Sequence, residues 1–99
     1  MAHGGDGVIS VISNVVPAVM SALCEAMARG DLADARRLDA VLAPVTHAAF
    51  IESNPIPAKA MLAMMGRMRN QLRLPLVPLL ATHHPLLRAA LVQAGALAA

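Results

Sequence analysis

The feature that most constrains this chain is a short β-branched run near its N-terminus, Val8 to Ile12. It follows the turn-forming residues Gly4 to Gly7 and is nearly continuous in apolar residues, which is typical of a strand covered on both faces in a parallel sheet. A lone strand leaves backbone N–H and C=O groups unpaired along both edges, and even a two-stranded hairpin is marginal in water. The run therefore predicts a strand whose neighbours are not among these 99 residues.

The rest of the chain has about four helical segments. Ser13 or Asn14 can cap a first helix that has Pro17 in its first turn. This helix is expected to end at Gly30, in the left-handed backbone conformation that glycine adopts after a helix. Asp31 then caps a second helix. Its expected apolar face holds Leu32, Ala35, Leu38, Leu42, Val45 and Ala49, with Asp34 in a capping-box-like position and a kink at Pro44.

Prolines and glycines divide the second half. The Asn54 to Pro57 segment breaks the helix, because residues before proline avoid the helical region. A short third helix is expected from Pro57 to Met65, ending at Gly66, and Arg73 to Leu79 is expected to be an extended, docked connector. The last expected helix is capped by Thr82, has Pro85 early and Gly95 after it, and turns Leu86, Leu87, Ala90 and Leu91 inward.

Composition narrows the class of protein. Apolar residues make up 58 % and charged residues 14 %, against roughly 45–50 % and 25 % in average domains. This excludes intrinsic disorder, and a single cysteine excludes an internal disulfide. The net charge of +2 comes without a basic cluster or stacking aromatics, so no nucleic-acid partner is expected. The uncharged run Gly7 to Cys24 contains polar residues and Pro17, so no membrane span is expected, and the chain is placed in the cytoplasm.

Three motifs in order resemble dihydrodipicolinate synthase, of the pyruvate-dependent class I aldolase superfamily. They are GGDGVISV with SNV after it (Gly4 to Val15), NPIPAK (Asn54 to Lys59) and RLPLVPL (Arg73 to Leu79). The resemblance covers nearly all 99 residues but only the last third of the family's chain. One departure is Ile12, where the family commonly has threonine.

The resemblance implies an α/β fold class: the C-terminal fragment of a (β/α)₈ TIM barrel, which needs about 250 residues, followed by a helical extension. Residues 1–30 would be the last βα unit and residues 31–99 the C-terminal helical extension. Taken alone, the chain would be mostly α.

The resemblance also implies an activity. Family members are lyases of lysine and diaminopimelate biosynthesis that condense pyruvate with L-aspartate semialdehyde through a lysine Schiff base, with a tyrosine that relays protons. This chain has no tyrosine, and its one lysine, Lys59, matches the NPIP motif rather than the Schiff-base position. We therefore expect no catalytic residue here and no activity of the chain alone. The expected partners are the rest of the barrel and, when complete, further copies in a homo-oligomer (tetramer or dimer).

One substrate-binding residue is carried over by resemblance. Ile9 matches the family's isoleucine of GVISV, which lines the pyruvate site chiefly through its backbone. The carboxyl ends of barrel strands form active sites, so within a complete barrel Ile9 to Ser13 are expected to form pocket wall. In the chain by itself we expect Ile9 to be a core residue.

The other reactive residue types favour structural roles. We expect Lys59 to be a solvated lysine at a helix start and Cys24 to be a small buried hydrophobe. His83 and His84 adjoin but point apart, so no metal and no cofactor is expected. The methionines Met61, Met64, Met65 and Met68 have helical spacing that indicates core filling, and Arg67, Arg69 and Arg73 indicate a solvated face.

The residues alone leave a second hypothesis open. A chain this apolar can also be an independent small helical protein that binds a partner or a membrane through surplus apolar surface. A soluble, cooperatively melting monomer would favour that alternative.

Overall fold

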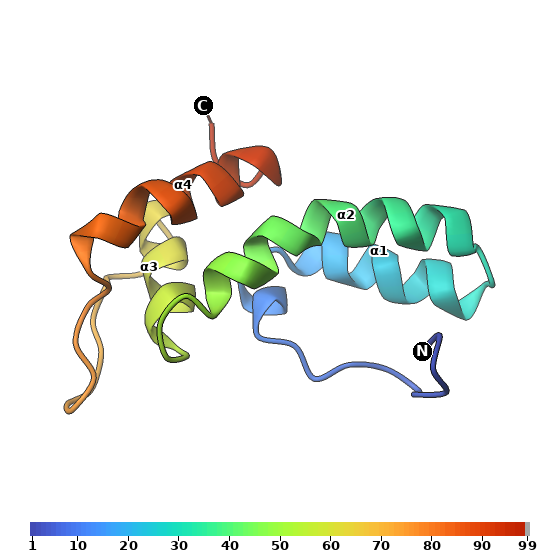
Figure 1. The fold of residues 1–99 in the computed structure, drawn as a ribbon, viewed down its shortest axis with the longest axis horizontal. Coiled ribbons are helices and arrows are strands. Elements are labelled where there is room, and N and C mark those ends of the chain that lie inside the picture. The colour runs from blue at the N-terminus through green and yellow to red at the C-terminus, as the bar shows by residue number, and fades with distance from the viewer. Residues whose placement is uncertain (99) are drawn as a thin grey trace.

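The fold of this chain consists of helices joined by turns and loops, in a computed structural model that describes residues 1–98 (Figure 1). Within that range no strand is present. The elements are η1 (Ile12–Asn14), α1 (Pro17–Ala28), α2 (Leu32–Ala49), α3 (Ile56–Met64), η2 (Ala81–His83) and α4 (His84–Gln93). The predicted four helical segments are confirmed.

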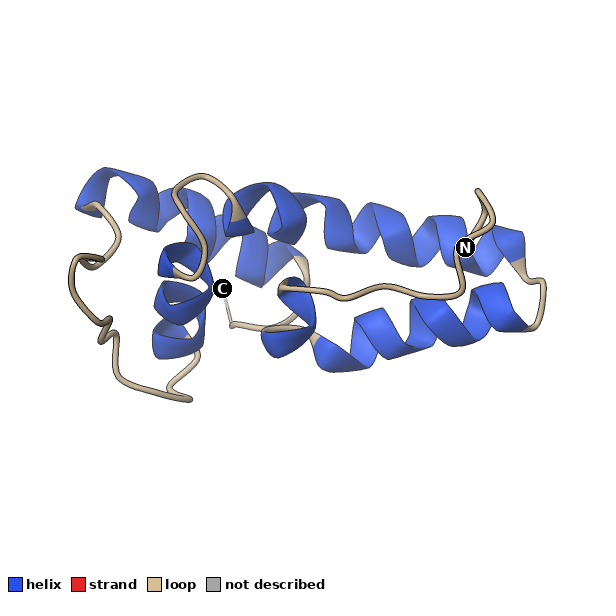
Figure 2. Cartoon of the chain, turned by 90° about the horizontal axis from the view of Figure 1, so that it is seen from below, coloured by secondary structure: helices blue, strands red, loops and turns tan. Residues whose placement is uncertain are grey.

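Helices α1 and α2 form an antiparallel pair that lies side by side in both views (Figures 1 and 2). The conformation of the turn between them is determined by residues within the turn. Gly30 has a φ of 76°, which glycine adopts without a Cβ clash, and the Asp31 carboxylate accepts a hydrogen bond from the Asp34 N–H at 3.0 Å. Both features were predicted. Asp34 does not complete a capping box: its carboxylate binds Arg29 and Arg37 instead.

The main core lies where the C-terminal half of α2 meets η1, α3 and α4. Val45, Met61, Leu87 and Leu91 are fully buried there. Helix α2 continues through Pro44 without a break, and α4 packs across its C-terminal half. A smaller cluster of Ala26, Ala35 and Leu38 joins α1 to the N-terminal half of α2.

The predicted strand Val8 to Ile12 is wrong for this chain. Residues 7–11 carry no regular secondary structure, and Ile12 is the first residue of η1. The segment runs as an extended trace beside α1 and α2 (Figures 1 and 2). A strand exists only when a second strand supplies hydrogen-bond partners, and no described residue supplies them.

Two predicted caps and one predicted core residue are also wrong. The N-cap of α1 is Val16, and Ser13 and Asn14 instead bond back to Ser10 and Val11 in the turn around η1. Thr82 lies inside η2, so α4 begins at His84 with no side-chain cap. Because Leu86 precedes Leu87 on the helix, it lies about 100° round the axis and is 40 % exposed.

Helix α3 begins at Ile56 and ends at Met64, one residue from the predicted bounds at each end, and Gly66 follows with a φ of 73°. The predicted extended break from Asn54 to Pro57 is wrong in part: Asn54 and Pro55 form a turn, and Ile56 and Pro57 already belong to α3. The predicted connector, Arg73 to Leu79, contains no helix, as expected, but a turn at Leu74 and Pro75 interrupts its extended course.

Candidate functional site

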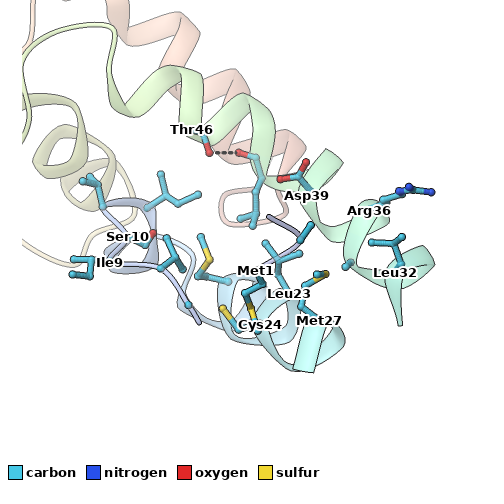
Figure 3. A pocket seen from close by; sticks show the side chains of 18 of the residues that line it. Met1, Ile9, Ser10, Leu23, Cys24, Met27, Leu32, Arg36, Asp39 and Thr46 are labelled. Atoms are coloured by element: carbon cyan, nitrogen blue, oxygen red, sulfur yellow. Dashed lines mark hydrogen bonds between the residues drawn. The ribbon is translucent and has the colours of Figure 1, made fainter. Parts of the chain in front are cut away.

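An apolar groove runs between the N-terminal segment and the α1–α2 pair, with a cavity volume of about 670 Å³ (Figure 3). Its floor comes from one face of α1, with Leu23, Cys24 and Met27, and from α2, with Leu32 and Leu42. Residues 7–12 form its other wall. The predicted functional segment therefore does line a groove, although it is not a strand.

Ile9 lies on the wall of this groove and is fully exposed, and Val8 is 59 % exposed. The expectation that Ile9 is a core residue of the chain by itself is wrong, because no described element lies over it. Within residues 1–98, no backbone N–H of residues 5–11 donates a hydrogen bond. The segment thus combines exposed apolar side chains with free backbone donors.

Few groups in the groove can do chemistry. Arg36 and Asp39 line it from α2, and the Thr46 hydroxyl is already bonded to the Leu42 carbonyl at 3.0 Å (Figure 3). Cys24 is only half-buried, rather than enclosed as expected, and the hydroxyls of Ser10 and Thr46 that also line the groove are hydrogen-bonded to other residues. The lining of the groove is therefore mostly apolar.

A second polar arrangement joins the α2–α3 corner to the start of α4. One oxygen of Glu52, Oε2, accepts the Leu80 N–H at 3.0 Å and lies 2.7 Å from His83 Nδ1. These contacts, the His83 hydrogen bond first, lower the pKa of the Glu52 carboxyl below its ordinary value of 4.5. Both side chains are mostly covered, with 19 % of Glu52 and 31 % of His83 exposed.

Sequence reasoning missed the Glu52–His83 pair. The two residues are 31 positions apart, so no local spacing brings them together. The only signal available was a single carboxylate just before the proline-rich break and two histidines just before the last helix. His84, by contrast, is exposed, as the prediction that the two rings point apart implies.

Lys59 lies on α3, and its ammonium donates a hydrogen bond to the Gln71 carbonyl at 3.1 Å. With Arg69 and Arg73 it lines an open hollow of about 500 Å³. Lys59 is therefore tied to the connector, more constrained than the solvated lysine that was expected. Among the predicted core methionines, Met61 is fully buried, Met64 and Met65 are half-buried, and Met68 is 37 % exposed.

No group of three or more His, Cys, Asp or Glu side chains in residues 1–98 could hold a metal ion. None of the helices in that range has the length and apolar character needed to cross a bilayer.

Comparison with known proteins gives a consistent result. The sequence model of the Dihydrodipicolinate synthetase family matches residues 1–94. The 4-hydroxy-tetrahydrodipicolinate synthase of Oleidesulfovibrio alaskensis is 55 % identical over 92 residues, covering 93 % of this chain and 32 % of the relative.

Solved structures agree with the sequence match. Dihydrodipicolinate synthase from Thermotoga maritima superposes with a TM-score of 0.93 at 48 % identity, over 97 % of this chain and 32 % of that one. The chloride-inhibited dihydrodipicolinate synthase from Acinetobacter baumannii, solved in complex with pyruvate, gives 0.90 at 40 % identity, over 95 % and 32 %. The chain spans about a third of the length of the relatives it matches, and it belongs to the dihydrodipicolinate synthetase family.

Proposed function

We propose that these residues are the C-terminal third of a dihydrodipicolinate synthase barrel, with residues 1–30 as its last βα unit and residues 31–99 as its helical extension. The complete assembly would condense pyruvate with L-aspartate semialdehyde through a lysine Schiff base in the cytoplasm. The observation that carries this proposal is the pair Val8 and Ile9, which lie in an extended segment beside an apolar groove, are exposed, and make no backbone hydrogen bonds to the described residues.

The physical argument is one of strand completion. An extended segment with free N–H groups and apolar side chains is a template for pairing with a neighbouring strand. In a (β/α)₈ barrel the neighbours are the seventh and first strands, which would pair with residues 8–10 and cover Val8. The exposed face of α1 would then pack on the outside of the barrel, which fills the groove.

Ile9 would become a substrate-binding residue in this assembly. It belongs to the segment Val8 to Ile12, and barrel enzymes place their active sites at the carboxyl ends of such segments. We propose that its backbone forms part of the pyruvate pocket. The side chain that forms the Schiff base would come from the rest of the barrel, because the ammonium of Lys59 is bonded to the connector.

One prediction tests the assignment of the Schiff-base lysine to the rest of the barrel. Pyruvate and borohydride should leave the mass of the isolated chain unchanged, since efficient trapping needs an unprotonated lysine held beside bound pyruvate. A pyruvyl adduct on Lys59 would contradict the assignment.

The decisive experiment is complementation. The first two thirds of the Oleidesulfovibrio alaskensis relative, produced separately, should gain synthase activity when mixed with this chain, and the lysine of that larger part should then be trapped by borohydride. Ile9→Asp should abolish the gain, because it buries a charge where strands must pair. The matched control is Val77→Asp, which changes an exposed apolar residue outside the groove and should complement normally.

The proposed complete enzyme is a homo-oligomer, a dimer or a tetramer. The mass of the complemented species in solution, measured by light scattering, tests this directly. A mass equal to one copy of each part would contradict it.

A further inference from the structure

The connector between α3 and α4 has little structure of its own. From Gly66 to Leu80 it contains no helix, and the backbone hydrogen bonds inside it join only near neighbours, such as Leu76 N–H to the Arg73 carbonyl at 3.0 Å. Leu74 is 85 % exposed and Val77 is 55 % exposed. Local contacts therefore do not determine where this segment lies.

Charged side chains from other elements hold the connector near both ends. Near its start, Lys59 donates to the Gln71 carbonyl at 3.1 Å. At its end, Glu52 accepts the Leu80 N–H at 3.0 Å and pairs with His83 at 2.7 Å. Leu79, beside the Glu52 contact, is buried in the main core.

The Glu52 contact differs from the other side-chain hydrogen bonds of the described chain. Glu52 bonds to Leu80 and His83, which lie 28 and 31 positions further along the chain. All the other side-chain hydrogen bonds, except that from Lys59 to Gln71, join residues within five positions of each other. A single carboxylate oxygen serves two donors from two successive parts of the chain, the last residues of the connector and η2. Removing its charge would weaken both contacts at once.

We propose that Glu52 is an acid-releasable latch that holds the connector, residues 67–80, and the start of α4 against the α2–α3 corner. Protonation of Glu52 would free the connector as a unit while the α1–α2 pair and the buried part of α2 stay folded. The latch follows from geometry: one carboxylate oxygen accepts from two donors at the end of the connector, whose other restraints are the Lys59 hydrogen bond and the packing of its leucines on the core, Leu72, Leu76 and Leu79.

The direction of the pH dependence follows from the lowered pKa of Glu52. A carboxyl with a folded pKa below its unfolded pKa stabilises the closed form above the unfolded value. That stabilisation is lost as pH falls through the folded pKa, below 4.5. The ionisable groups on the surrounding elements are His47 on α2, Lys59 on α3, and His84 and Arg88 on α4, and His83 is the one whose charge acts on Glu52.

Hydrogen exchange measured by mass spectrometry tests the latch from pH 7 to pH 3, with rates corrected for intrinsic exchange. The connector peptide should lose protection by about tenfold or more as pH falls, while peptides from α1 and α2 keep theirs. Simultaneous loss of protection in the connector and in α2 would overturn the proposal, since it would mean global unfolding.

The variant Glu52→Gln keeps a carbonyl acceptor and removes the charge. At pH 7 its connector should exchange about tenfold faster than in the wild type, and the pH dependence should be flat. Asp34→Asn is the matched control, because Asp34 also has a lowered pKa but lies on the α1–α2 pair; its connector should behave like the wild type. Wild-type protection in Glu52→Gln would overturn the proposal.

Proteolysis gives an independent readout at neutral pH. Arg67, Arg69 and Arg73 all lie in the connector, so trypsin should cut Glu52→Gln there about tenfold faster than the wild type. If Glu52→Gln does not fold, as judged by circular dichroism, His83→Ala replaces it. That variant keeps the Leu80 contact and should give a smaller increase at the same three sites; unchanged cleavage would count against the latch.

Discussion

The two halves of α2 have very different surroundings. Its C-terminal half packs against η1, α3 and α4, and Val45, Ala48 and Ala49 are fully buried there. Its N-terminal half packs on α1 through a small cluster, while Leu32 remains 43 % exposed and the adjoining groove is open.

This difference shows which neighbours each half of the helix has among the described residues. Helices of this chain cover most of the apolar surface of the C-terminal half, apart from Phe50 at its C-cap, which is 58 % exposed. The apolar surface of the N-terminal half and of α1 is covered only in part. This open face is the side on which we propose that a barrel packs, since the chain spans only about a third of its relatives' length.

The largest expected effect tests the enclosed half. Leu91→Ala removes a fully buried side chain of α4 and should lower the free energy of unfolding by about 3 kcal/mol, within the usual range of roughly 2–5 for such truncations. Urea unfolding followed by circular dichroism measures this change.

Leu32→Ala and Ile9→Ala are the matched truncations at the open half. Both side chains are exposed, so each should change the free energy of unfolding by less than about 0.5 kcal/mol. Losses comparable to that of Leu91→Ala would show that the groove closes in solution and would contradict the comparison.

Local sequence signals predicted the parts of the fold that depend on neighbouring residues. Gly30 and Gly66 have the positive φ expected at helix ends, and Asp31 caps α2 as its position before Leu32 indicates. Asn54 and Pro55 form a turn and the connector contains no helix, as the steric restriction on residues before proline indicates. These features need no distant partner, which is why sequence alone is sufficient to place them.

Features that depend on distant partners could not be predicted in the same way. Val8 to Ile12 has strand composition, but a strand also needs hydrogen bonds from another segment, which residues 1–98 do not provide. The Glu52–His83 contact depends on the fold bringing together residues 31 positions apart. The groove itself was not predicted, because helical periodicity shows which face is apolar and not whether that face is covered.

A medium effect is expected at the turn that joins the α1–α2 pair. Asp31→Ala removes the side-chain cap of α2 and should lower the free energy of unfolding by about 1 kcal/mol. Asp31→Asn keeps a capping oxygen and should lose far less. Because this turn belongs to the less enclosed end, the loss should appear as faster hydrogen exchange in the first turns of α2; equal stability of wild type and Asp31→Ala would contradict the role of the cap.

The smallest effect concerns the charges at the same end. Asp34 accepts hydrogen bonds from Arg37 at 2.7 Å and 3.0 Å and from Arg29 at 2.8 Å, and the Arg37 hydrogen bond is the main cause that lowers its pKa below the ordinary 3.8. Its contribution to stability is therefore present above pH 3.8 and is lost as pH falls through the lower, folded value.

Unfolding at a series of pH values from 5 to 2 should show a shallower loss of stability in Asp34→Asn than in the wild type. The difference should shrink in 1 M salt, because exposed ion pairs are screened. Connector exchange in the same samples should be unchanged by Asp34→Asn, since Glu52 acts at the other end of α2. If Asp34→Asn altered connector exchange as well, the two ends of α2 would be coupled and would not behave as separate regions.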